Sequence, residues 1–87
     1  MRPNKDLYNA IYEGRLDAVA AIIEETANIP DDALVMAVEQ YELSIAQYLI
    51  DHGANINAIP SRIMDSAVIN GEVDVVSFLN NITNISM

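Results

Sequence analysis

Apolar residues recur along this chain at intervals of three and four positions, and short polar segments separate the recurring groups. The segment 45–50 shows the pattern clearly. Its apolar residues include Ile45, Leu49 and Ile50, with Tyr48 beside them. This spacing places side chains along one face of an α-helix. The pattern stops at Gly53, and glycine readily adopts the positive φ at which many helices end. We therefore expect an amphipathic helix that ends close to Gly53.

The same criterion predicts six helices, arranged as three pairs. Their expected ranges are 5–13, 16–25, 32–40, 43–52, 61–70 and 73–81. A tight turn separates the two helices of each pair, at Gly14, Tyr41 and Gly71. Polar side chains are expected to cap the first helix of each pair. The expected capping residues are Asn4, Asp31 and Ser61. The tail 82–87 is expected to fray.

The three helix pairs repeat one pattern of apolar positions. The middle pair aligns with the first after a shift of 27 residues and with the third after a shift of 30. An alanine stands at one position of each copy, at Ala10, Ala37 and Ala67. A small side chain there permits the first helices of neighbouring pairs to approach closely. One pair cannot bury its apolar face alone, and about three are needed for a stable array. The repetition therefore predicts a stack of pairs.

The middle copy resembles the end of an ankyrin repeat. The resemblance rests on the apolar pair Leu49 and Ile50, on the following segment 53–57, which reads Gly-Ala-Asn-Ile-Asn, and on the recurrence of the pattern in three copies. It implies an all-α fold, a solenoid of three stacked antiparallel helix pairs. One domain would cover residues 1–87, with repeats at about 5–29, 32–57 and 61–85. A compact six-helix bundle of the same helices is the alternative.

The copies are shorter than a standard ankyrin repeat. Such repeats run about 33 residues, so the spacings here fall short by roughly six and three residues. The missing residues lie between copies, in the segment that forms β-hairpin fingers in the family. Of the family signature Thr-Pro-Leu-His, only the large apolar third position is kept, at Leu7, Leu34 and Met64. We therefore expect shortened or missing fingers.

The composition is that of a folded protein. Hydrophobic residues make up 52% of the 87 residues, and cysteine is absent, which excludes disulfides and thiol chemistry. No strictly apolar run exceeds six residues, whereas a membrane span needs about 20. The polar N-terminal residues lack the apolar core of a signal peptide. We therefore expect an intracellular, cytoplasmic protein.

The net charge is −9, and the acidic residues dominate one part of the sequence. Residues 16–61 contain eight acids and no lysine or arginine. Such a surface repels the phosphates of nucleic acids, so we expect no direct nucleic-acid binding. It attracts a basic protein partner and speeds the association. Alternatively, the charge only keeps a small domain soluble.

Candidate groups for catalysis, metal binding or cofactor binding are sparse. His52 is the only histidine, and it suits the negative end of the dipole of a predicted helix. Three glycines cannot form a phosphate-binding loop, and no serine lies in a nucleophile elbow. The adjacent acids at 24–25 and 31–32 point in different directions on a helix or cap it. We therefore predict a non-enzymatic protein without a metal or a cofactor.

The ankyrin resemblance implies a binding surface on the concave side of the stack. In that family, exposed positions of the first helix of each pair and the adjoining turns contact partners. The corresponding residues here are Asp6, Asn9, Glu13, Ala33, Met36, Gln40, Tyr41, Ile63, Ser66 and Asn70. Tyr41 stands out, because tyrosine is frequent among the residues that dominate interface energies. The alternative is that Tyr41 and Met36 pack internally over the shortened loops.

Two functions follow as hypotheses. The first is a small, non-catalytic module that binds a protein partner through its concave helix face. The second is an acidic inhibitor that blocks a basic or nucleic-acid-binding groove of a partner enzyme. Salt separates the two hypotheses. The affinity of a groove-blocking inhibitor falls steeply as ionic strength rises, whereas an apolar interface is much less sensitive.

The last predicted helix carries more large apolar residues than one stripe can bury. They are Val73, Val75, Val76, Phe78 and Leu79, all within seven positions. Exposed apolar surface of this kind usually marks an interface. One interpretation is self-association as a homodimer through Val75, Phe78 and Leu79. The other is that the tail folds back, with Ile82 and Ile85 shielding the helix.

Overall fold

The computed structural model describes the backbone of residues 5–84 and the side chains of residues 5–82. This part of the chain forms six α-helices and one short 3-10 helix. The helix pairs are α1 (Lys5–Tyr12) with α2 (Leu16–Thr26), α3 (Asp31–Glu39) with α4 (Leu43–Asp51), and α5 (Ser61–Asn70) with α6 (Val73–Asn84). The 3-10 helix η1 (Ile56–Ala58) precedes α5. The predicted all-α class is therefore confirmed.

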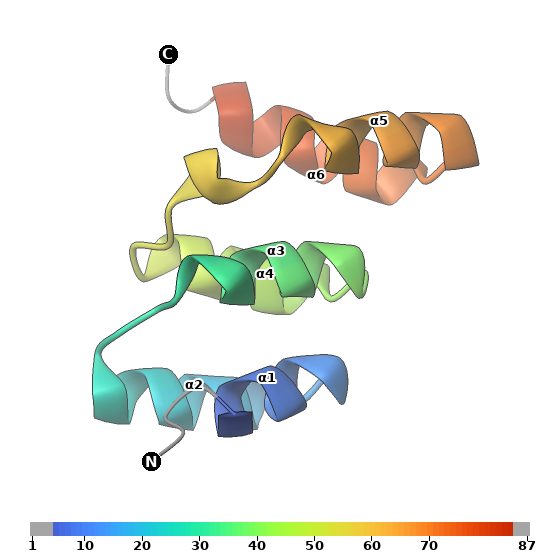
Figure 1. Ribbon diagram of the computed structural model, residues 1–87. Coiled ribbons are helices and arrows are strands. Elements are labelled where there is room, and N and C mark those ends of the chain that lie inside the picture. The colour runs from blue at the N-terminus through green and yellow to red at the C-terminus, as the bar shows by residue number, and fades with distance from the viewer. Residues whose placement is uncertain (1–4, 85–87) are drawn as a thin grey trace.

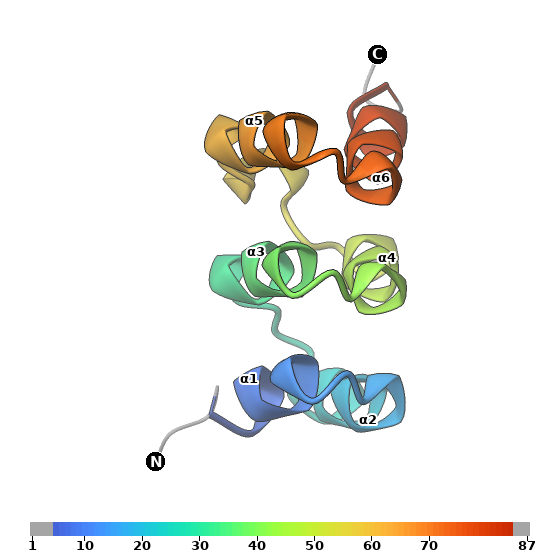
Figure 2. The ribbon, with the colours of Figure 1, turned by 90° about the vertical axis from the view of Figure 1, so that its right-hand side faces the viewer.

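The three pairs are stacked as layers, one above the other (Figure 1). In the view of Figure 2, α1, α3 and α5 line one flank of the stack, and α2, α4 and α6 line the other. The described part of the chain is accordingly elongated, with extents of 38 × 27 × 20 Å. Its buried side chains form one continuous cluster between the layers and the flanks. The stack, and not the compact bundle, is the arrangement that the chain adopts.

The same turn joins the two helices of every pair. One residue of the turn has a positive φ, which is 72° at Gly14, 62° at Tyr41 and 72° at Gly71. The next amide donates a hydrogen bond to the carbonyl oxygen of the recurring alanine. These bonds run from Arg15 to Ala10 (2.9 Å), from Glu42 to Ala37 (2.8 Å) and from Glu72 to Ala67 (2.9 Å). Glycine adopts positive φ without steric cost and tyrosine does not, so Tyr41 is the unusual member of the set.

Small residues bring the first two pairs close together. Ala33 and Ala37 of α3 have no exposed surface, and Ala10 of α1 is 5% exposed. Helix α1 packs against α3, and α2 packs against α4. The leucines of the second pair, Leu34 and Leu49, are also fully buried, and each such side chain contributes about 1.5–3 kcal/mol. The second pair, covered on both sides, is therefore the centre of the core.

The third pair packs less closely against the second than the second does against the first (Figure 1). The linker before α5 is the longer one, and it contains η1, which packs against α3. At the start of η1 the Asn55 side chain accepts a hydrogen bond of 3.0 Å from the Asn57 amide. This segment stands where the family has a finger, and residues 5–84 contain no strand. The expectation of missing fingers is confirmed for this part of the chain.

Two of the predicted helix caps are wrong. Pro30 and Pro60 occupy the N-cap positions of α3 and α5, and neither position makes a side-chain cap hydrogen bond. Asp31 and Ser61 are instead the first residues of these helices. Proline fits the N-cap position because its φ, −65° at Pro30 and −68° at Pro60, suits the extended backbone that precedes a helix. The third predicted cap, Asn4, lies outside the described residues.

The last helix is longer than the sequence analysis predicted. Helix α6 continues to Asn84, whereas fraying was expected from residue 82. The reason is that Ile82 is 2% exposed and belongs to the core cluster, so its burial stabilises the final turns. Ile85 lies outside the described residues. None of the described helices combines the length and the apolar character that crossing a membrane requires.

Candidate partner-binding surface

Most of the predicted partner-binding residues are accessible to a partner. Asp6, Asn9, Glu13, Gln40, Tyr41, Ser66 and Asn70 are exposed, and Met36 is half-buried. They lie on α1, α3 and α5 or in the turns that follow these helices. The three helices that carry these residues share one flank of the stack (Figure 2).

Two of the predicted contact residues are buried, so the expectation that they are exposed is wrong. Ala33 has no exposed surface, and Ile63 is 7% exposed. The equivalent residue of the first pair, Asp6, is exposed. This position therefore faces the preceding pair, which α1 lacks within the described residues. The sequence carried a signal of this, because the position is apolar in the second and third copies and charged in the first.

The sequence analysis missed another exposed position on the same helices. It is occupied by Tyr12, Glu39 and Ile69, and the exposed fractions of Tyr12 and Ile69 are 69% and 82%. Arg62 of α5 donates a hydrogen bond of 3.3 Å to the carboxylate of Glu39 on α3 and so connects the second and third pairs. Both side chains are largely exposed, so this ion pair contributes about 1 kcal/mol at most. The alignment of the repeats could have predicted this, because a charged residue at Glu39 indicates that the equivalent positions Tyr12 and Ile69 are exposed.

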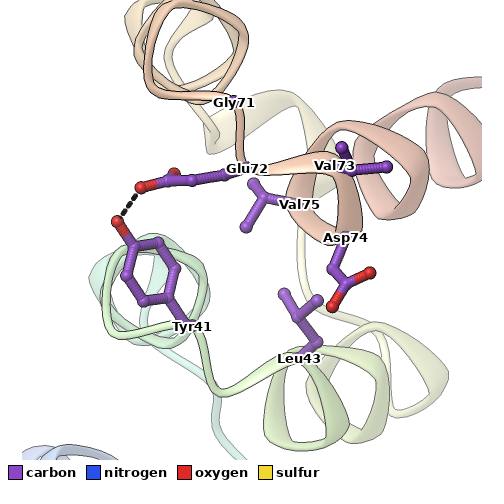
Figure 3. A pocket seen from close by; sticks show the side chains of 7 residues that line it. All are labelled: Tyr41, Leu43, Gly71, Glu72, Val73, Asp74 and Val75. Carbon is purple, nitrogen blue, oxygen red and sulfur yellow. Dashed lines mark hydrogen bonds between the residues drawn. The ribbon is translucent and has the colours of Figure 1, made fainter.

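A glutamate of one turn reaches back to the turn of the preceding pair. The carboxylate of Glu42 lies over Gly14, where an added β-carbon would be 2.7 Å from Glu42 Oε2. At the equivalent place in the third pair, the Tyr41 hydroxyl donates a hydrogen bond to the carboxylate of Glu72 (Figure 3). Tyr41 thus stands between its own turn and Glu72, whereas Gly14 leaves room for the carboxylate of Glu42. The interaction joins residues 31 positions apart.

A pocket of about 420 Å³ opens beside the Tyr41–Glu72 contact. It is lined by Tyr41, Leu43, Gly71, Glu72, Val73, Asp74 and Val75 (Figure 3). The side chains of Leu43 and Val75 lie between the carboxylates of Glu72 and Asp74. The hydrogen bond to Glu72 raises the pKa of the Tyr41 phenol above its ordinary value, and partial burial and the charge of Glu72 act in the same direction. The lining therefore combines apolar side chains, an aromatic ring and two carboxylates.

His52 has the structural role that the sequence predicted. It follows the last turn of α4 as the C-cap residue. Its Nδ1 lies 2.9 Å from the carbonyl oxygen of Tyr48, and because a carbonyl only accepts, Nδ1 carries the hydrogen. Its ring also stacks on that of Tyr48, with 4.0 Å between the ring centroids. Across the described residues, no group of three or more His, Asp or Glu side chains is placed to hold a metal ion.

The comparison with known protein families agrees with this geometry. A family model described as ankyrin repeats matches residues 7–86 as three copies. The chain belongs to the ankyrin repeat family. No curated protein and no solved structure gives a significant match. Ankyrin repeats are generally protein–protein interaction modules, and the family is typically non-catalytic.

The third ankyrin repeat buries two of the residues predicted to mediate self-association. Val75 and Leu79 are each 4% exposed, and Phe78 is half-buried. Val75, Leu79 and Ile82 are spaced by four and three residues, which places them on one face of α6 within the core. The expectation that Val75 and Leu79 are exposed is therefore wrong. The tail does not fold back at Ile82 but continues as helix.

The exposed apolar surface of the third ankyrin repeat lies elsewhere. Val68, Ile69 and Val73 have exposed fractions of 59%, 82% and 70%. The equivalents of Val68 in the first two repeats are Ile11 and Val38, which are at most 1% exposed. This position therefore faces the following repeat, and in the third repeat nothing among the described residues covers it.

Proposed function

We propose that this chain is a non-catalytic ankyrin-repeat module that binds a protein partner through the first helices of its repeats and the turns after them. The observation that carries the proposal is Tyr41. Its φ of 62° disfavours a residue with a side chain, and it is nevertheless 58% exposed. Internal contacts explain only part of this choice of residue, because Tyr41 bonds to Glu72 and still has more than half of its surface in water. Contact with a partner gives a reason for a tyrosine at a position that favours glycine.

Other residues of the predicted surface suit such an interface. Met36 is half-buried, and a flexible thioether adapts to the shape of a partner. Gln40 and Asn70 are exposed and neutral, so they can exchange hydrogen bonds with water for hydrogen bonds with a partner. Gln40 and Asn70 line one pocket together with Tyr41, and an aromatic residue with polar neighbours is common in interfaces.

The test begins with affinity capture of a protein partner from the source cell, followed by measurement of its affinity for purified variants. We expect Tyr41→Ala to weaken binding about fivefold or more, because truncating an anchoring tyrosine costs over about 1 kcal/mol. Glu24→Ala is the control, since Glu24 is exposed and lies on α2, outside the proposed surface. Equal affinities of the wild type and Tyr41→Ala, with both folded, would refute the proposed interface.

A second candidate function is an acidic inhibitor of a basic or nucleic-acid-binding groove on a partner enzyme. It is favoured by the net charge of −9 and by the absence of lysine and arginine from residues 16–61. In this case the affinity for the captured partner falls steeply between low and high salt. An affinity that changes little with salt would leave the first proposal and remove the second.

We also propose that the third repeat supports self-association, through Val68, Ile69 and Val73 together with the half-buried Phe78. Val68 occupies a position that is buried in the first two repeats, and Ile69 and Val73 add further exposed apolar surface. A two-fold dimer would bury the same surface on both copies. A head-to-tail stack is less favourable, because it would place the carboxylate of Asp6 in a buried contact.

A further inference from the structure

The pocket beside Tyr41 owes its shape to one substitution within the repeat pattern. At the first turn the carboxylate of Glu42 closes over Gly14, at a distance that leaves no room for a β-carbon. At the second turn a phenol ring stands in that place, and Glu72 bonds to the end of the ring. Tyr41 therefore keeps the Glu72 carboxylate away from the turn, and the pocket opens in the space beside it (Figure 3).

The lining of the pocket combines apolar and negative groups in a particular arrangement. Leu43, Val73 and Val75 are the apolar lining residues, of which Val73 is 70% exposed, and Glu72 and Asp74 add two carboxylates (Figure 3). The ion pairs within residues 5–84 are Arg15–Asp17 and Arg62–Glu39, and neither involves the two pocket carboxylates. The lining residues contribute two negative charges and no positive charge.

We propose that this pocket receives one arginine or lysine side chain of the protein partner. Both side chains have an apolar stem that can pack on Leu43 and the exposed Val73, and a cationic head that can reach a carboxylate. The Tyr41 ring also lines the pocket, and an aromatic ring can attract a cation. The proposal rests on the proposed function in one respect, that the partner is a protein. It adds the chemical class of the group that the partner inserts.

The charge and the lining of the pocket argue against other occupants. A purely apolar side chain would leave two carboxylates partly desolvated without a partner, which is unfavourable. An acidic group or a phosphate would be repelled by Glu72 and Asp74. A basic side chain is the occupant whose stem and head match both parts of the lining.

The test uses amide NMR titration of the full chain with three blocked tripeptides. They carry arginine, lysine or citrulline between two alanines, and citrulline keeps the shape of arginine without its charge. We expect saturable shifts at Tyr41, Glu72 and Asp74 with the arginine or lysine peptide and none with citrulline. The stronger of the two basic peptides identifies the preferred head group. Equal shifts with citrulline, or shifts spread over all exposed acids, would overturn the proposal.

Matched variants locate the site. Glu72→Gln removes one charge but keeps an oxygen that can accept the Tyr41 hydrogen bond, so the fold is retained. We expect it to weaken binding of the basic peptide about fivefold. Glu25→Gln, an exposed acid on α2, makes the same change to the net charge and should leave the affinity unchanged. A loss of affinity as large for Glu25→Gln as for Glu72→Gln would mean that only the overall charge is sensed, and the pocket would be refuted.

The tyrosine itself supplies a structural test. Tyr41→Gly should let Glu72 approach the turn as Glu42 approaches Gly14, which closes the pocket and abolishes the peptide shifts. The outcome is separable from that of the proposed function. If the captured partner depends on Tyr41 while the peptides do not bind, the pocket proposal fails and the interaction module stands. If the peptides bind as expected while the captured partner ignores Tyr41, the module's proposed interface fails, and the pocket stands as a site for a basic side chain that this partner does not use.

Discussion

Two valines at the same position of neighbouring repeats offer a direct test of the stacking. Val38 of α3 is 1% exposed, and Val68 of α5 is 59% exposed. Both lie one residue after a buried alanine, Ala37 or Ala67, in the middle or last turns of a helix. The substitutions Val38→Ala and Val68→Ala therefore make the same chemical change in the same local structure, and only the layer above differs.

The expected magnitudes follow from burial. Replacing Val38 removes two buried carbons at about 0.8 kcal/mol each, and the cavity that remains raises the cost to about 2–3 kcal/mol. Replacing Val68 removes carbons that are mostly in water. Alanine is also the better helix former by up to about 0.7 kcal/mol. We therefore expect Val68→Ala to change the free energy of unfolding by no more than about 0.5 kcal/mol in either direction.

The assay is urea unfolding followed by circular dichroism, at a protein concentration where sedimentation finds a monomer. Midpoints and slopes are compared together, because short repeat arrays need not unfold in one step. Equal destabilisation by the two substitutions in the monomer would refute the reasoning, since it would mean that Val68 is covered within a single chain.

Further predictions address the core, the turn and the third repeat. Leu49→Ala, at a fully buried site, should cost about 2–5 kcal/mol in urea unfolding, and a cost below about 1 kcal/mol would contradict its central place. Ala37→Leu should overpack the contact of α3 with α1 and cost about 1–3 kcal/mol, and an unchanged melting temperature would argue against the stacked register. The raised pKa of the Tyr41 phenol means that the folded state holds this proton more tightly than the unfolded state does. The resulting contribution to the stability of the fold is complete below pH 10.0, the ordinary pKa, and is lost as the pH rises through the pKa of the folded state. A difference titration of phenolate absorbance between the wild type and Tyr41→Phe should show this, and a Tyr41 pKa at or below the ordinary value would contradict it. Sedimentation at micromolar concentrations should show a dimer that Val68→Glu dissolves, and a monomer at every concentration would refute self-association.

The sequence by itself determined the helices, the turns between them and their repetition. These features depend on short-range interactions. The turn at Gly14, for example, is closed by the Arg15 amide on the carbonyl oxygen of Ala10, only five residues away. A local pattern that recurs three times therefore predicts three local structures, and the family match to three copies agrees. The caps of α3 and α5 were predicted one residue too late in the sequence, as with Asp31 in place of Pro30.

Only the tertiary structure decided which apolar residues are covered. Val38 and Val68 have the same local context, yet one is buried and the other is exposed, because a following layer lies over the first and none of the described residues forms one over the second. The candidate site likewise depends on how the repeats stack. Tyr41 and Glu72 meet across two repeats, and no local pattern relates residues 31 positions apart. Helical periodicity shows which side of a helix is apolar, but the neighbour that covers that side is set by how the layers stack.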